Sequence, residues 1–401
     1  MRRGSAIVTA FVFLATGVQA APRIAPFPET GTGIHLEMVF NYKMNGDYEA
    51  EAGKVDAVWG SDVPATPSGV YNSWYIPFNV DDFTNSVDWY LQNHPDWLAY
   101  KCDKVTLAYV PGSAQAPLDF ANPEVRAYQW ASWIDAKLDQ GYPSIAVDLL
   151  ALTNDQNRCG HYAKDGTTWV PEYDSGAVDL KKYRRDVLKW ERLTYRHVHD
   201  YSPTATMQVN VTYPYHTSWP NQNIALMTTS DLVLDERGFT EFGFPPALPS
   251  PEDWQIIVDK IDTVHKKGRC YTLVNEVPGT NDDITEAQRQ WVIANYLLTK
   301  TDRDSAKRNC DYMYITGQQD YGALVLSDDY TIAIGRPMAE RAARNGAWER
   351  RYSGGLALVN PTLSSVTFKL PPGDWTDLSG NPVRRRMTMA KQTGLLLLKA
   401  K

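Results

Sequence analysis

Residues 122–148, NPEVRAYQWASWIDAKLDQGYPSIAVD, join an amphipathic helix directly to a buried strand. Asn122 is a favourable N-cap, Pro123 suits the first helical position, and Gly141 is a typical helix terminator. The apolar side chains between them recur at helical spacing, and the run SIAVD follows at once. A helix that leads into a wholly apolar strand is typical of parallel sheets covered by helices.

The same unit recurs between about residues 30 and 320. Helices are indicated after Asp179, Ser250 and Thr285, and each leads to a short apolar run. The predicted strands are residues 34–40, 71–77, 97–100 or 105–109, 145–149, 207–211, 232–235, 270–274 and 312–315. Eight such units predict an α/β fold of the (β/α)8 TIM-barrel type. A doubly wound sheet is the alternative, but no glycine-rich phosphate-binding motif follows any strand.

The two ends of the chain differ from this pattern. Residues 1–20 combine two arginines, an apolar stretch and a small-residue cleavage site, which predicts a signal peptide and a secreted or periplasmic protein. The barrel is predicted to span 21–327. Residues 328–401 alternate short apolar runs with turn clusters and predict a small C-terminal antiparallel β domain, sandwich-like in character.

The net charge and the lack of long apolar runs argue against two kinds of partner, nucleic acid and a lipid bilayer. The chain has 401 residues and a formal net charge of -7, which argues against nucleic acid because phosphate binding needs a basic surface. After the signal peptide no apolar run reaches the length of a membrane span, so no transmembrane segment is expected in the mature chain. Oligomeric state has no signature in the sequence.

The four cysteines are predicted to form two disulfides, with free buried thiols as the alternative. Cys270 and Cys310 each begin a predicted strand, the seventh and the eighth, which are neighbours in a barrel. Cys102 and Cys159 follow the third and fourth predicted strands, at the opposite end. The expected pairs are therefore Cys102–Cys159 and Cys270–Cys310. No cysteine or histidine spacing indicates a metal site, and no cofactor is expected.

Polar residues end several predicted strands, where TIM barrels place their active sites. They are Asp148, Asn210, Asp235, Glu236, Arg237, Asn275, Glu276 and Tyr314. Two carboxyl groups at one barrel mouth are the minimum for hydrolysing a glycosidic bond: one protonates the leaving oxygen, and the other attacks or activates water. Asp235 and Glu236 are adjacent, so strand alternation points them to opposite sides, and only one is expected to face the mouth. Each carboxylate could instead cap a helix or form a structural ion pair.

These motifs resemble a family of bacterial barrels. Residues 94–98, HPDWL, and 118–126, LDFANPEVR, precede GYPSIAVD at 141–148, and LVLDERGF follows at 232–239. In this order they resemble hypothetical glycosyl hydrolases, similar in pattern to endo-polygalactosaminidases. The chain departs from the pattern at Pro143-Ser144, where the family has Asp-Gly, which leaves Asp148 as the one acid there. The resemblance implies Asp148 as nucleophile or base and Glu236 as acid.

Aromatic side chains in the loops could bind a sugar. Trp59, Trp169 and Trp219 follow predicted strands or lie in the connections after them, as do Tyr213 and Tyr215. Aromatic rings at a barrel mouth can stack on the apolar faces of sugars, although each could equally plug its loop onto the barrel. With Asn210, Arg237, Asn275, Glu276 and Tyr314, the three tryptophans are the predicted substrate-binding residues, and Asp148, Glu236 and Asp235 are the candidate catalytic acids.

The sequence therefore predicts an exported glycoside hydrolase acting on a polysaccharide or oligosaccharide. A barrel that binds carbohydrate without cleaving it is the alternative. A lyase or aldolase barrel would normally need a lysine at a strand end, and none is found. The sugar, its linkage and the stereochemical course stay open.

Overall fold

The structure is a computed structural model of the chain. It describes residues 33–40, 55–64, 69–110, 112–178, 180–211, 220–240, 248–301, 310–323 and 326–400. The predicted signal peptide lies outside this described part.

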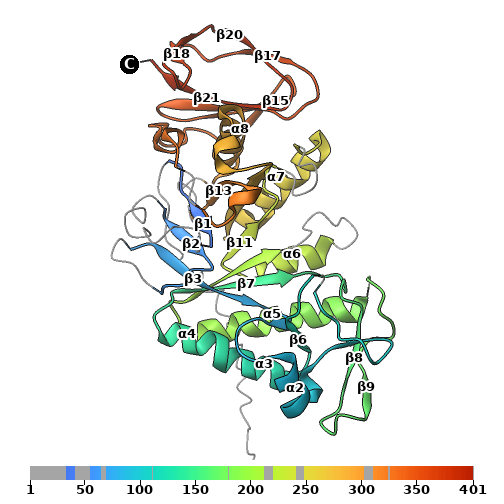
Figure 1. The fold of residues 1–401 in the computed structure, drawn as a ribbon. Helices are drawn as coiled ribbons and strands as arrows, with labels where there is room; N and C mark the ends of the chain where they lie inside the picture. The colour runs from blue at the N-terminus through green and yellow to red at the C-terminus, as the bar shows by residue number, and fades with distance from the viewer. Residues whose placement is uncertain are drawn as a thin grey trace, which may run out of the picture.

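An eight-stranded parallel sheet forms the centre of the molecule (Figure 1). Its strands, in sheet order, are β1 (Glu37–Val39), β2 (Ala57–Trp59), β3 (Tyr71–Pro77), β7 (Ser144–Leu150), β10 (Thr206–Val211), β11 (Leu232–Asp235), β12 (Cys270–Val277) and β13 (Tyr312–Gly317). A parallel bridge between Leu36 and Met313 joins the first strand to the last, so the sheet closes on itself. The predicted (β/α)8 barrel is confirmed.

The assignment of the second and third strands was wrong. The second strand is β2, which is only three residues long, and the predicted second strand, 71–77, is the third, β3. Residues 97–100 and 105–109 lie outside the barrel. A strand of three residues is too short to show a periodic pattern, so the sequence offered no signal for β2.

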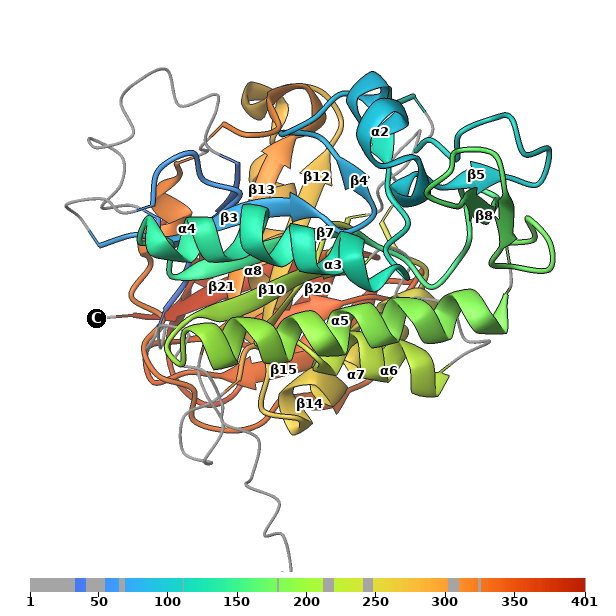
Figure 2. The ribbon, with the colours of Figure 1, turned by 90° about the horizontal axis from the view of Figure 1, so that it is seen from below.

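The helices cover the outside of the barrel. They are α3 (Pro123–Gln129), continued by a π-helical turn (Trp130–Asp135) and α4 (Ala136–Asp139), then α5 (Lys181–Tyr201), α6 (Pro220–Thr228), α7 (Pro251–Lys266) and α8 (Glu286–Thr299). The predicted caps form: Asn122 accepts from the Glu124 amide at 2.9 Å, and Ser250 from the Asp253 amide at 3.1 Å. From below, the continuous helix formed by α3, the π turn and α4 lies beside α5 across the barrel strands (Figure 2).

Two long insertions follow β3 and β7, between these strands and the helices α3 and α5, and are called the two excursions below. The first contains β4 (Val80–Asp81), α2 (Val87–Asn93), β5 (Tyr100–Lys101) and β6 (Ala116–Pro117). The second contains β8 (Arg158–Tyr162) and β9 (Trp169–Pro171), and β5 pairs with β8 so that the two excursions share one small sheet. The Cys102–Cys159 disulfide joins them, with Cα atoms 5.0 Å apart.

Both predicted disulfides are confirmed. Cys270 and Cys310 are bonded at the start of β12 and just before β13, with Cα atoms 5.3 Å apart. Among the described helices none is long and apolar enough to cross a lipid bilayer.

Antiparallel strands occupy the C-terminal part, as predicted. The main sheet has the order β14 (Ala342–Arg344), β15 (Ala347–Arg351), β16 (Gly355–Asn360), β21 (Thr393–Lys399), β18 (Trp375–Thr376) and β19 (Pro382–Val383), and β17 (Val366–Lys369) pairs with β20 (Arg386–Met389). Side chains alternate along β16: Ala357 and Val359 join the barrel core, whereas Leu356 and Leu358 belong to a separate apolar cluster. This sheet lies against α8 (Figure 1).

Candidate active site

Four polar side chains gather where adjacent barrel strands end. Asp148 lies on β7, Asn210 on β10, Glu236 directly after β11, and Glu276 on β12. These strands are consecutive in the sheet, so their carboxyl ends meet at one sector of the barrel mouth. We call these four residues the acid cluster.

A bulge in β7 shapes the position of Asp148. Val147 pairs with Val209 and Leu150 with Val211, so Asp148 and Leu149 together lie opposite the single residue Asn210. Leu149 has φ of 62°, in the left-handed region that a leucine rarely adopts. Bulges and backbone strain of this kind concentrate at functional sites, where they direct a side chain.

Asn210 bridges two of the carboxylates. Its Nδ2 donates to Asp148 Oδ1 at 2.8 Å, and its side chain also hydrogen-bonds Glu236. Tyr75, on β3, donates its hydroxyl to the other Asp148 oxygen at 2.9 Å. Both donors favour the ionised carboxylate, but burial outweighs them and raises the pKa of Asp148.

Glu236 has the environment of a group that exchanges a proton near neutral pH. Burial, followed by the nearby charge of Asp148, raises its pKa to about 7. The hydroxyl of Tyr321 donates to Glu236 Oε1 at 2.8 Å and partly opposes this rise. A carboxyl group with a pKa near the working pH can act as a general acid.

Glu276 is the third acid and is buried on β12, with 3% of its surface exposed. Burial and the charge of Glu236 raise its pKa to about 8. At neutral pH Glu276 is therefore mostly protonated, and it adds little negative charge beside Glu236.

Asp235, the third candidate catalytic acid, lies next to the acid cluster, and its charge contributes to the raised pKa of Glu236, but its own partners lie elsewhere. It is 1% exposed, accepts from the Tyr271 hydroxyl at 2.7 Å, and pairs with Lys260 Nζ of α7 at 3.3 Å. These partners lie in the barrel wall and the helix layer. The expected alternation holds: Asp235 faces the wall and Glu236 the mouth.

Asn275 and Tyr314, two predicted substrate-binding residues, are buried in the barrel wall. The Asn275 amide donates to the carbonyls of Leu273 and Tyr314, and its oxygen accepts from the Phe239 amide at 2.8 Å. Asn275 is completely buried and Tyr314 is 2% exposed. Asn275 therefore holds the turn that follows Glu236.

The predicted aromatic platforms are not found in the described residues. Trp59 is 1% exposed and belongs to the core, because the short strand β2 turns it inward. Trp169 is half-buried on β9, where its ring meets Tyr162 and Lys104 of the small excursion sheet. Arg237 is half-buried, and its charge acts on Lys260, the partner of Asp235. Trp219 lies outside the described residues, as do Tyr213 and Tyr215.

Sequence reasoning missed the two tyrosines that serve the acids. Tyr75 lies mid-strand in an aromatic run, and Tyr321 lies beyond the last barrel strand, after a short 3-10 turn (Gln318–Asp320). Phe40 connects them, with ring centroids 5.3 Å from Tyr75 and 6.2 Å from Tyr321. The strand that carries Tyr75 was predicted with the bounds it has, so attention to tyrosines near strand ends would have found this residue.

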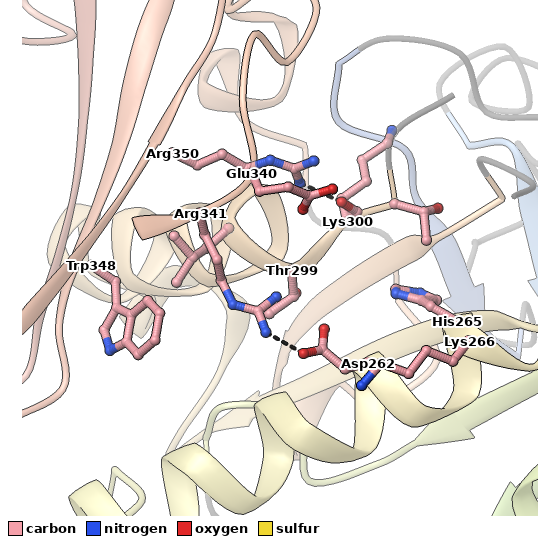
Figure 3. Close-up of a pocket in the computed structure, with 11 residues that line it drawn as sticks. Asp262, His265, Lys266, Thr299, Lys300, Glu340, Arg341, Trp348 and Arg350 are labelled. Carbon is pink, nitrogen blue, oxygen red and sulfur yellow. Dashed lines mark hydrogen bonds and ion pairs between the residues drawn. The ribbon is translucent and has the colours of Figure 1, made fainter. Parts of the chain in front are cut away.

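A cavity of about 360 Å³ lies between α7, α8 and β15, away from the acid cluster (Figure 3). Its charged groups are engaged in structural contacts. Arg341 pairs with Asp262, and Arg350 donates to the carbonyls of Leu297 and Lys300 at the end of α8. These contacts fasten the C-terminal strands to the helices, so this cavity is not a candidate active site.

Comparisons with known proteins place several glycoside hydrolases among the similar solved structures. A variant of the glycoside hydrolase domain of PelA from Pseudomonas aeruginosa has 12% identity and a TM-score of 0.45, covering 74% of this chain and 99% of that one. A maltogenic alpha-amylase, AmyB from Thermotoga neapolitana, has 12% identity and a TM-score of 0.46, covering 92% and 99%. No protein-family model matches, and neither does any curated protein. The function of this chain must therefore be argued from its own residues.

Proposed function

We propose that the protein is an exported glycoside hydrolase whose acid cluster cleaves a polysaccharide or oligosaccharide. The observation that carries the proposal is the bridge by Asn210, which holds Asp148 and Glu236 together at the barrel mouth with raised pKa values. Asp148 is the nucleophile or base, and Glu236 is the general acid. Two carboxyl groups with these roles suffice for glycoside hydrolysis.

We propose the retaining course, in which Asp148 attacks the anomeric carbon. Interaction of one amide group with both carboxyl groups keeps Asp148 and Glu236 close to each other. Retaining glycosidases separate their carboxyl groups by about 5–5.5 Å, and inverting enzymes by about 6.5–9.5 Å. A short separation therefore supports Asp148 as the nucleophile.

The acids divide the work between two steps. Glu236, protonated, gives its proton to the leaving oxygen while Asp148 forms the glycosyl ester. Glu236, now ionised, then takes a proton from the water that hydrolyses the ester and returns to its starting state. The Tyr75 hydroxyl supports the charge on Asp148 before attack, and the Tyr321 hydroxyl supports Glu236 once it has lost its proton.

Export is part of the proposal. Disulfides persist in oxidising compartments, and the two found here fit the predicted signal peptide. Cleavage of the chain after residue 20 during secretion, observed as the N-terminal sequence of the exported protein, tests this part.

Release of reducing ends from a panel of polysaccharides tests the activity, with the anomer first formed followed by NMR. Glu236→Gln keeps the shape of the acid but removes its proton, so substrates with poor leaving groups should lose most activity and aryl glycosides with activated leaving groups least. The matched control is Asp235→Asn, because Asp235 is a wall residue: its loss should lower stability without this dependence on the leaving group. Equal loss on both kinds of substrate in Glu236→Gln would assign the acid elsewhere, with Glu276 as the next candidate.

A carbohydrate-binding barrel without catalysis is the rival function. It predicts that the wild-type protein binds a polysaccharide but releases no reducing ends from it at any pH between 5 and 9.

A further inference from the structure

A second cluster of ionisable side chains lies outside the barrel mouth, in the two excursions. Asp119 follows β6, His161 lies on β8, and Glu172 follows β9. One ligand atom from each lies within 4.8 Å of the other two. Imidazole nitrogen with two carboxylate oxygens is a common ligand set for divalent transition metals.

The atoms of this cluster are close together and buried. Asp119 Oδ2 and His161 Nδ1 are 3.0 Å apart, within ion-pair distance, and Asp119 also interacts with Glu172. Neither Asp119 Oδ2 nor His161 Nδ1 has a partner aligned as a hydrogen bond among the described residues, and the Asp119 side chain is only 3% exposed. A buried carboxylate oxygen without an aligned donor is costly unless something else coordinates it.

A further buried polar atom near the cluster lacks a hydrogen-bond partner within the described part of the chain. The hydroxyl of Tyr173, next to Glu172, is likewise buried without a partner. Two carboxyl groups held together in this way repel each other when both are ionised. Lys182 Nζ lies 3.6 Å from Glu172, on a side chain that is 45% exposed.

We infer that Asp119, His161 and Glu172 form a binding site for a divalent transition-metal ion, with Zn²⁺ as the best match. Tetrahedral zinc with ligands at about 2.0–2.2 Å places them about 3.4 Å from each other. Ligand atoms now up to 4.8 Å apart would need to close by at most about 1.4 Å, and the Asp119–His161 pair, 3.0 Å apart, would open slightly. Water would supply the fourth ligand. Calcium is disfavoured because it prefers oxygen ligands alone.

The position gives such an ion a structural role. Asp119 belongs to the excursion after β3, and His161 and Glu172 to the excursion after β7. The Cys102–Cys159 disulfide and the buried Arg158, which donates to the Asn79 carbonyl at 2.8 Å, already connect these excursions. A metal ion would tie them together beside the strands that carry Tyr75 and Asp148. This role is independent of the chemistry proposed for the acid cluster.

Calorimetric titration of the metal-free protein with Zn²⁺, and separately with Ca²⁺, tests the inference. One equivalent of Zn²⁺ should bind, more tightly than Ca²⁺, and raise the midpoint of thermal unfolding. His161→Gln and Glu172→Gln should each weaken zinc binding about 100-fold or more, since loss of even an outer-shell partner costs about 10–100-fold.

Two further variants make the test specific. Lys182→Gln removes the competing ammonium and should tighten zinc binding several-fold, which a purely structural ion-pair network would not do. His197→Gln is the matched control, because His197 forms an aligned 2.7 Å pair with Asp135 and is not part of the three-residue cluster. Zinc binding by this variant should be unchanged.

Titration of Glu236→Gln shows whether zinc binds at the acid cluster instead, and its zinc binding should equal that of wild type. Absence of stoichiometric zinc binding, or its loss in Glu236→Gln with retention in His161→Gln, would overturn the inference.

Discussion

Replacement of Tyr321 by phenylalanine changes the proton affinity of Glu236 in a direction and by an amount that the structure fixes. Its hydroxyl donates to Glu236 Oε1 at 2.8 Å. Hydrogen bonds to charged groups contribute about 1.5–3 kcal/mol and those to neutral groups about 0.5–1.5 kcal/mol, so this one favours the ionised carboxylate by about 1–1.5 kcal/mol. One pKa unit corresponds to about 1.4 kcal/mol. Tyr321→Phe should therefore raise the pKa of Glu236 by about one unit, from about 7 to about 8.

The pKa is measured by NMR titration of protein labelled at the glutamate carboxyl carbon, with the Glu236 signal assigned from its absence in Glu236→Gln. On any substrate found in the polysaccharide panel, the alkaline limb of kcat/KM should move to higher pH by the same unit, since the general acid must be protonated. Tyr201→Phe is the matched control, because its hydroxyl makes the same kind of bond, 2.8 Å to Asp139, on an exposed helix. An unchanged or lower pKa in Tyr321→Phe, or an equal shift in Tyr201→Phe, would refute the reasoning.

Three other predictions concern stability and positioning. Glu276 has a pKa of about 8 in the folded protein, against 4.5 for an ordinary glutamate, so the folded state binds the extra proton. Wild-type stability should therefore fall as pH rises from about 5 to 8, by up to about 5 kcal/mol from this group, and urea unfolding of Glu276→Gln should lose that part of the pH dependence. Replacing Cys270 and Cys310 together by serine opens a loop with a sequence separation of 40, which should cost about 4 kcal/mol in urea unfolding, and the difference between wild type and variant should disappear under reducing conditions, which open both disulfides. Gly238 has φ of 46°, and a Cβ there would lie 2.5 Å from Asn275 Oδ1. Gly238→Ala should therefore displace the turn after Glu236 and lower kcat by a larger factor than it raises KM. Gly380→Ala is the control, because a Cβ at that turn would have no atom within 4 Å, and it should leave kcat and KM unchanged.

The sequence revealed the fold where its elements were long. The Asn122 cap and the run ending at Asp148 are local signals, and both formed as expected. The apolar stripe predicted for the helix between them was largely wrong: a π-helical turn interrupts the helix, and its buried side chains include Val125, Trp133 and Ile134, whereas Ala127 and Ala131 are exposed. The three-residue strand β2 has no periodicity of its own, and its partners in the barrel define it. Because β2 was not predicted, the later strands were misnumbered, and Trp59, a core residue, was predicted to lie in a loop.

The candidate site was predictable only in part, for a related reason. Strand-end position identified Asp148, Asn210, Glu236 and Glu276, because the carboxyl ends of parallel strands meet at one edge. The same rule could not separate these residues from Asn275 and Asp235, whose roles depend on partners from other elements, such as the Phe239 amide and Lys260. Tyr321 comes from beyond the last strand, so no strand-based rule would have found it.

The most direct test of the central claim compares wild type with Asp148→Asn on a polysaccharide that both bind. Removal of the nucleophile or base should abolish release of reducing ends: the rate should fall by more than the factor of about 10²–10⁴ that acid–base assistance alone typically contributes. The affinity for the polysaccharide should stay nearly the same. Near-normal release by Asp148→Asn, or binding without release by the wild-type protein, would contradict the assignment of the acid cluster as a glycoside hydrolase active site.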